Sequence, residues 1–121
     1  MKVLVVDDEP TLRHLIKTNL DFEGFDTLTA ANGAEALEVI AREHPDVVLL
    51  DVMMPVLDGW GVLSALNEDP EGSPRVILVS ALARDHLHVR GWELGCTEYI
   101  TKPFDFDDLI ARIRNVSTVP S

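Results

Sequence analysis

The residues best suited to chemistry in this chain are carboxylates, a hydroxyl and an ammonium group, each of which follows a short apolar run. Asp7 and Asp8 follow the first run, Asp51 follows a later one, and Ser80 and Lys102 follow two more. Crowded carboxylates raise each other's pKa, so a protein keeps them together when a cation neutralises them. The ligands available here are all oxygen atoms, which suit Mg²⁺ or Mn²⁺ rather than zinc. A divalent ion together with the lysine would balance the charge of the three aspartates.

These side chains meet only if the apolar runs form one parallel sheet. The runs that we predict as strands are Lys2–Val6, Asp46–Leu50, Arg75–Val79 and Glu98–Thr101, with a weaker one at Thr27–Ala30. The first three are continuous runs of β-branched residues and leucine without alternation, which is typical of strands covered on both faces. Because the carboxyl ends of parallel strands form the binding edge of such a sheet, the polar residues that follow them are expected to converge there.

Helical patterns separate the predicted strands. Leu12, Leu15, Ile16 and Leu20 repeat at helical spacing, and Gly24 suits a left-handed C-cap. The further helices are expected after a turn at Asn32-Gly33 with a stop at Pro45, around Val62–Leu66, around Leu87–Leu94 with a cap at Gly95, and around Leu109–Ile113.

This alternation of strand and helix, repeated five times, predicts an α/β doubly wound sheet with helices on both faces. The predicted fold is flavodoxin-like, with strand order 2-1-3-4-5. We expect one domain over residues 1–116 and a tail, or the start of a linker, at 117–121.

Composition excludes several classes of function. The chain has 121 residues, with 10 Lys and Arg against 21 Asp and Glu, for a net charge of −11. This balance argues against direct nucleic-acid binding by this domain and against attraction to an anionic membrane. A single cysteine, Cys96, leaves no internal disulfide and no multi-cysteine metal site. No apolar stretch approaches the roughly 20 residues of a spanning helix, and the first residues do not read as a signal peptide. We therefore expect a cytoplasmic domain.

Four motifs, matching in order and spacing, resemble the receiver domain of bacterial two-component response regulators. They are V-L-V-V-D-D-E-P at Val3–Pro10, L-L-D-V-M-M-P at Leu49–Pro55 followed by Asp58-Gly59, V-S-A at Val79–Ala81, and T-K-P-F at Thr101–Phe104. The resemblance covers about Lys2 to Ile113. It implies a phosphoprotein of phosphorelay signal transduction. Such a domain is not an enzyme with a separate substrate, although it catalyses its own phosphorylation and slow dephosphorylation.

The resemblance implies a role for each acidic residue. Asp51 would accept a phosphoryl group from the phosphohistidine of a sensor histidine kinase or of a phosphotransfer protein. Asp8 would bind Mg²⁺ directly and Asp7 through water, with Asp51 and the backbone carbonyl of Met53 as further ligands. Phosphoryl transfer needs little from a protein beyond positioning and neutralisation of the phosphoryl oxygens, which agrees with this set of residues.

The remaining motif residues would contact the phosphoryl group or respond to it. By the same resemblance, Lys102 would pair with one phosphoryl oxygen, Ser80 would donate a hydrogen bond to another, and the N–H of Ala81 would assist. The Lys102-Pro103 peptide bond would be cis. On phosphorylation Ser80 would move toward the new oxygens, and Tyr99 would fill the vacated space as the second switch residue.

A more specific resemblance concerns the second half of the chain. V-R-G-W-E-L-G at Val89–Gly95 and L-I-A-R-I-R at Leu109–Arg114 are similar to receivers that precede winged-helix DNA-binding domains. This implies transcription regulation by a longer protein and a phosphorylation-dependent homodimer through the fourth helix, fifth strand and fifth helix. The candidate dimer residues are Trp92 and Ile110 as an apolar patch, with Glu98–Arg112 and Asp108–His88 as intersubunit pairs. A solvated charged face is the competing interpretation.

Three other functions compete. An aspartyl-nucleophile phosphohydrolase generally has a second aspartate two residues after its nucleophile, where this chain has Met53. A flavodoxin-like redox carrier needs a first loop that binds phosphate, which Asp7 and Asp8 would repel. A pseudo-receiver, acting as a phosphorylation-independent interaction module, usually lacks the acceptor aspartate or the lysine, and both are present here as Asp51 and Lys102.

Overall fold

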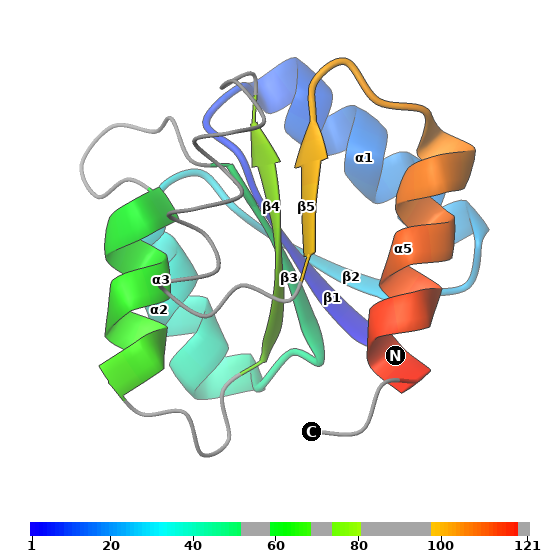
Figure 1. The fold of residues 1–121 in the computed structure, drawn as a ribbon. Coiled ribbons are helices and arrows are strands. Elements are labelled where there is room, and N and C mark those ends of the chain that lie inside the picture. Colours follow the sequence, from blue (N-terminus) through cyan, green and yellow to red (C-terminus); the bar gives the residue numbers. More distant parts are fainter. Residues whose placement is uncertain (52–58, 69–73, 81–97, 119–121) are drawn as a thin grey trace.

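The apolar runs of the sequence form a parallel sheet that lies between two layers of helices (Figure 1). The computed structural model describes residues 1–51, 59–68, 74–80 and 98–118. The strands in these ranges are β1 (Lys2–Val6), β2 (Asp26–Ala30), β3 (Val47–Asp51), β4 (Arg75–Ser80) and β5 (Glu98–Thr101). The helices are α1 (Pro10–Phe22), α2 (Gly33–Glu43), α3 (Gly59–Glu68) and α5 (Phe106–Thr118). The helix predicted around Leu87–Leu94 lies outside the described residues.

The strand order is β2-β1-β3-β4-β5, and every pair of neighbours is parallel, which confirms the predicted topology. Val6 at the end of β1 pairs with Ala30 on one side and with Leu50 on the other. Asp51 pairs with Val79, and Ser80 pairs with Thr101. The register therefore aligns the carboxyl ends of the strands along one edge of the sheet, at the top of Figure 1.

The sheet extends slightly further toward this edge than the apolar pattern predicts. β3 runs to Asp51 and β4 runs to Ser80, so both residues are the last of a strand rather than the first of a loop. The backbone continues to pair after the apolar side chains have ended, because pairing depends on register and not on side-chain type. The acceptor predicted at Asp51 is consequently held by the sheet itself.

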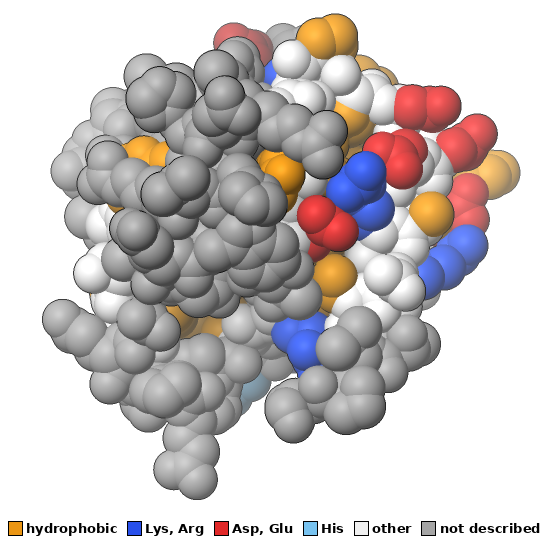
Figure 2. Space-filling view, viewed as in Figure 1, with side chains coloured by type: hydrophobic (Ala, Val, Ile, Leu, Met, Phe, Trp, Pro, Cys, Tyr) orange, Lys and Arg blue, Asp and Glu red, His pale blue; other side chains and the backbone are white. Residues whose placement is uncertain are grey.

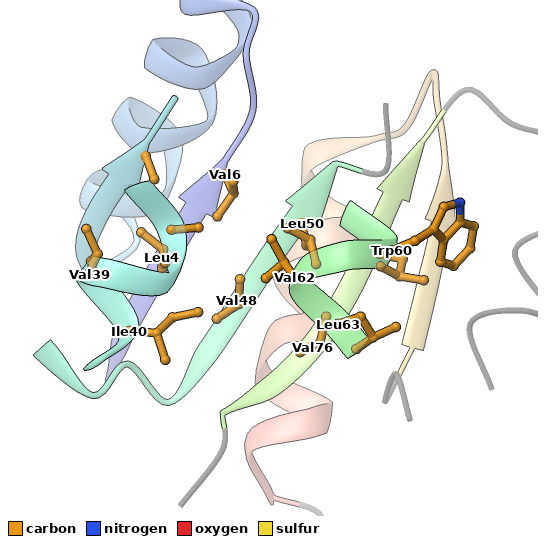
Figure 3. Close-up of a cluster of buried hydrophobic side chains, with 13 residues drawn as sticks. Leu4, Val6, Val39, Ile40, Val48, Leu50, Trp60, Val62, Leu63 and Val76 are labelled. Atoms are coloured by element: carbon orange, nitrogen blue, oxygen red, sulfur yellow. The ribbon is translucent and has the colours of Figure 1, made fainter. Parts of the chain in front are cut away.

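Each strand sends alternate side chains to opposite faces, and both faces are covered. On one face, Leu4 and Val6 of β1 pack with Val48 of β3 and with side chains of α2 and α3, such as Val39 and Val62 (Figure 3). On the other face, side chains of α1 and α5 form one buried cluster with side chains of β1, β3, β4 and β5: Val3, Val5, Ile16, Leu20, Val47, Leu49, Ile77, Val79, Ile100, Leu109, Ile110, Ile113 and Val116. This two-sided burial explains why the strands read as unbroken apolar runs.

The end of α1 follows the prediction made from Gly24. The Phe25 N–H donates to Leu20 O at 3.1 Å, and the Gly24 N–H donates to Asp21 O at 3.1 Å. These two bonds form a Schellman motif, which requires a left-handed residue after the helix. Gly24 has φ +92°, and an added Cβ would meet nothing within 4 Å.

The start of α2 differs from the prediction. Asn32-Gly33 is not a separate turn: Asn32 is the N-cap of the helix, and its side chain accepts a hydrogen bond from the Glu35 N–H at 2.9 Å. Glu35 in return accepts from the Ala31 N–H at 3.2 Å. Asparagine satisfies a free N–H at a helix start as readily as it favours a turn, so the pair of residues alone does not separate the two.

Of the helices in the described ranges, none combines the length and the apolar composition that crossing a bilayer requires. At the carboxyl end of the described chain, the last turn of α5 includes Ser117 and Thr118.

We predict that Gly24→Ala lowers the free energy of unfolding by about 1 kcal/mol, because an L-residue pays roughly that cost in the left-handed region. Since the Cβ has free space, the loss arises from the backbone alone, and Gly24→Asn should lose less because asparagine tolerates this conformation. Thermal unfolding of the three proteins measures the effect, which corresponds to a Tm change of about 4 °C. Equal stability of the wild type and the alanine variant would contradict it.

Candidate functional site

Asp7, Asp51 and Lys102 meet at the carboxyl edge of the sheet, as the sequence predicts. Asp7 directly follows β1, Asp51 ends β3, and Lys102 directly follows β5. The Lys102 Nζ donates to Asp7 Oδ2 at 3.1 Å and to Asp51 Oδ2 at 3.0 Å. Because the order is β1-β3-β4-β5, the lysine reaches across the end of β4 to Asp51 and across the ends of β4 and β3 to Asp7.

The two carboxylates are almost completely removed from water. Asp7 is 2% exposed and Asp51 is 5% exposed, whereas Lys102 is partly buried. Burial by itself lowers the pKa of Lys102, but its hydrogen bond and charge interaction with Asp51, and then those with Asp7, outweigh that effect and raise its pKa above the ordinary value. Lys102 is therefore charged throughout the physiological range.

Asp8 completes an acidic cluster on the open side of the site. Carboxylate oxygens of Asp7, Asp8 and Asp51 lie within 4.8 Å of one another. Asp8 is exposed and makes no hydrogen bond within the described part of the chain. Three carboxylates and one ammonium leave two negative charges, and the donors are all oxygens. The cluster therefore fits a hard divalent ion such as Mg²⁺ or Mn²⁺.

The loop that carries these acids is held by its own neighbours. The Glu9 N–H donates to Asp7 Oδ1 at 2.9 Å, while the Glu9 side chain caps α1 by accepting from the Thr11 N–H at 3.1 Å. The Arg13 Nη1 donates to the backbone oxygen of Asp7 at 2.7 Å. The sequence predictions omit Arg13. The one signal for it is a cation one turn into the helix that follows an acidic loop.

Of the other predicted site residues, some lie in the described part of the chain and some lie outside it. Ser80 ends β4 in register with Thr101, so its backbone lies at the same edge as Asp51. Tyr99 lies in β5 and packs, partly buried, against the cluster shown in Figure 3. The Lys102-Pro103 peptide bond is cis, the isomer that the resemblance implies. The predicted backbone contacts of Met53 and Ala81 lie outside the described residues.

The elements β5 and α5 carry Glu98, Asp108 and Arg112 of the predicted dimer surface. Figure 2 shows acidic and basic side chains next to one another on this side of the molecule. Within this single chain, the Arg112 Nη1 lies 3.2 Å from Glu98 Oε1, and the Arg112 Nε lies 3.1 Å from Asp108 Oδ2. Ile110, predicted as part of an exposed apolar patch, is only 6% exposed and belongs to the interior cluster with α1. It shares the helix face of Leu109 and Ile113, which the core requires. Trp92 and His88 lie outside the described residues.

Comparison with known proteins gives one consistent result. Residues 3–114 match the family model of the response regulator receiver domain. The chain is 45% identical over 115 residues to a probable transcriptional regulator, ycf27, of Porphyridium aerugineum, covering 95% of this chain and 47% of that protein. It is 40% identical over 116 residues to the response regulator MprA of Mycobacterium leprae, covering 94% and 50% respectively. The chain thus spans about half the length of the curated relatives it matches.

Solved structures agree with the sequence comparisons. The receiver domain of the Francisella response regulator 1452 superposes with a TM-score of 0.89 at 39% identity, covering 96% of this chain and 95% of that one. The BeF3-activated N-terminal receiver domain of RstA from Klebsiella pneumoniae superposes with a TM-score of 0.90 at 34% identity, covering 98% and 100%.

We predict that Asp8→Asn raises Tm by a few degrees when no divalent ion is present, because it removes one of three crowded charges and breaks no hydrogen bond among the described residues. The same variant should lose the stabilisation that MgCl₂ gives the wild type, since a ligand that binds only the folded state stabilises it. Thermal unfolding with and without MgCl₂ measures both effects. Asp26→Asn is the matched control, because Asp26 is exposed and lies at the opposite edge of the sheet. An Asp8 variant that behaves as this control would refute the assignment.

Proposed function

Because this chain belongs to the receiver-domain family of response regulators, we propose that Asp51 accepts a phosphoryl group from the phosphohistidine of a sensor histidine kinase or a phosphotransfer protein. The observation that carries the proposal is the Lys102 ammonium between the buried carboxylates of Asp7 and Asp51, 3.1 and 3.0 Å away, with Asp8 beside them. A buried carboxylate at a strand end, with a fixed cation beside it, suits attack on phosphorus.

The transfer is a simple exchange of bonds. A carboxylate oxygen of Asp51 attacks the phosphorus atom, an O–P bond forms, and the P–N bond to the donor imidazole breaks. The electron pair of that bond stays on the imidazole nitrogen, and the product on this chain is an acyl phosphate. The chain therefore catalyses its own modification, and we propose no separate substrate for it.

Lys102 has two tasks in this scheme. Before transfer, its ammonium group pairs with Asp51 and Asp7. After transfer, the same group can turn to a phosphoryl oxygen on Asp51, because the flexible lysine side chain reaches both the carboxylates and the phosphoryl group. Ser80, which ends the neighbouring strand, would supply a hydroxyl donor, and the Ala81 N–H a backbone donor. A charge that is already in place needs no reorganisation at the moment of reaction.

Mg²⁺ is the cofactor that the acidic cluster fits. Asp8 and Asp51 would hold it directly and Asp7 through water, together with the Met53 carbonyl. When bound, the ion supplies positive charge that offsets the phosphoryl oxygens as they approach the acidic site. Asp7 uses both of its oxygens on protein partners, Glu9 and Lys102, which agrees with its assignment as the indirect ligand.

Phosphorylation would be read out as a change of conformation. The modification adds charge and acceptor oxygens at Asp51. Ser80 would move toward them, and Tyr99, three residues before Lys102, would follow. The alternative of a pseudo-receiver finds no support, because the acceptor, the acidic cluster and the lysine are all present and meet at one edge. Since the relatives are about twice as long, control of transcription by a longer protein is part of the proposal, and a cytoplasmic location stays a prediction.

We predict that Asp51→Asn removes phosphorylation while leaving the fold intact. Wild-type protein incubated with acetyl phosphate and Mg²⁺ should gain the mass of one phosphoryl group. The variant should gain none, because an amide oxygen is a much poorer nucleophile than a carboxylate oxygen. Intact-mass spectrometry measures it. Asp46→Asn is the matched control, since Asp46 is exposed, directly precedes β3 at its amino end, and accepts a hydrogen bond from the Lys2 N–H. Full modification of the Asp51 variant would sink the proposal.

We also predict a phosphorylation-dependent homodimer through the face of β5 and α5. Exposed ion pairs contribute only about 0–1 kcal/mol each, and Arg112 already pairs with Glu98 and Asp108 inside one chain. Trp92 should therefore contribute most of the binding energy. Sedimentation velocity should show a monomer for the wild type, a dimer with beryllofluoride and Mg²⁺, and a monomer for Trp92→Ala in both conditions. A wild type that stays monomeric throughout would rule the dimer out.

A further inference from the structure

Arg13 makes an unusual choice of partner. It is half-buried at the start of α1, beside a loop with three consecutive acidic residues, Asp7, Asp8 and Glu9. A guanidinium in such surroundings is expected to pair with a carboxylate. Instead, its Nη1 donates to the backbone oxygen of Asp7 at 2.7 Å, and within the described ranges it forms no ion pair. The contact therefore holds the backbone, and Arg13 neutralises none of the carboxylates of this loop within the described residues.

The bonded oxygen belongs to the peptide group that joins Asp7 to Asp8. A peptide group is planar, so a bond to its oxygen fixes the orientation of the whole plane, including the Asp8 N–H. The next plane, between Asp8 and Glu9, is fixed separately, because the Glu9 N–H donates to Asp7 Oδ1 at 2.9 Å. Both planes that flank Asp8 are thus held, although the Asp8 side chain itself makes no hydrogen bond in the described residues.

The helix that follows makes this hold rigid. The Arg13 N–H donates to Glu9 O at 2.9 Å, and Glu9 caps the helix through its side chain. Arg13 is therefore fixed to the loop by the first turn of α1 and reaches back over that turn to Asp7. Asp7 is tied in turn to β2 by the bond from its N–H to Ala30 O at 3.2 Å.

We propose that Arg13 is a positioning residue for Mg²⁺: it orients the peptide plane before Asp8 so that this free carboxylate faces Asp51. The inference rests on the proposed Mg²⁺-dependent function of the site. Its physical basis is preorganisation, since a ligand that needs no ordering on binding loses less entropy when the metal arrives. Residues that orient metal ligands in this way typically change affinity by about 10–100-fold when they are replaced.

Charge and position predict opposite results, which makes the proposal testable. If Arg13 acted only through its charge, its removal would strengthen Mg²⁺ binding, because the cation repels the metal. If Arg13 acts by holding the Asp7 carbonyl, Arg13→Gln should raise the Kd for Mg²⁺ about tenfold. Arg13→Lys keeps the charge but has a shorter, single-point donor, so its Kd should lie between those of the wild type and the glutamine variant.

The experiment is a titration with MgCl₂ alone, followed by backbone amide chemical shifts in NMR spectra. Arg42→Gln is the matched control, because Arg42 is exposed in the last turn of α2, the helix that leads into the amino end of β3 at the opposite edge of the sheet. Its Kd should stay within about twofold of the wild type, since a distant surface charge is screened by salt. Hydrogen exchange of the Glu9 amide, measured without metal, should be faster in Arg13→Gln and unchanged in Arg42→Gln.

Each result decides the matter. A lower or unchanged Kd for Mg²⁺ in Arg13→Gln overturns the inference. If the Tm of this variant is also reduced while exchange of the Glu9 amide is unchanged, the role of Arg13 is purely structural. If the glutamine variant fails to fold, Arg13→Lys carries the same comparison. A wild type that binds no Mg²⁺ would overturn the proposed function together with the inference, whereas normal wild-type binding with unaltered Arg13 variants would overturn the inference alone.

Discussion

The arrangement of this domain depends on one ionic contact, in which Lys102 holds Asp7 and Asp51 at the carboxyl edge of the sheet. Two carboxylates this close and this buried would be costly without a cation, because burial penalises each charge and each charge raises the cost of the other. The lysine comes from the far side of β4. The sheet order therefore has to bring β5 beside β4, and a long side chain has to cover the remaining distance.

Lys102 neutralises only part of the negative charge of the site, and the remaining charge bears on the proposed chemistry. One ammonium cannot balance three carboxylates, so the site stays negative on the side where Asp8 is exposed. This residual charge attracts a divalent ion and repels anions such as phosphoryl donors. In the proposed function, a phosphoryl group would therefore approach favourably only with a metal bound, which would link phosphorylation to the metal through electrostatics.

Much of the fold could be predicted from the sequence because the sheet is buried on both faces. β1 and β5 match their predicted ranges, and β3 and β4 differ at their ends because backbone pairing continues through Asp51 and Ser80. The acids and the lysine of the site were predictable since each follows a strand. Arg13 was not, because a side chain that reaches back to a carbonyl leaves no periodic pattern. Ile110 was assigned to a surface by resemblance, whereas the same helix also had to fill the core, and the core takes precedence.

The contact between Lys102 and Asp7 joins residues 95 positions apart in the chain. During synthesis, the first three strands leave the ribosome with all three aspartates long before the lysine that compensates them. Until β5 has docked, Asp7 and Asp51 lack the ammonium group that pairs with them in the folded domain. In the proposed function, a nascent or partly folded chain would therefore lack a complete acceptor site. On the proposed function, phosphorylation would require the last strand to be in place, so the modification would depend on complete folding as well as on the kinase.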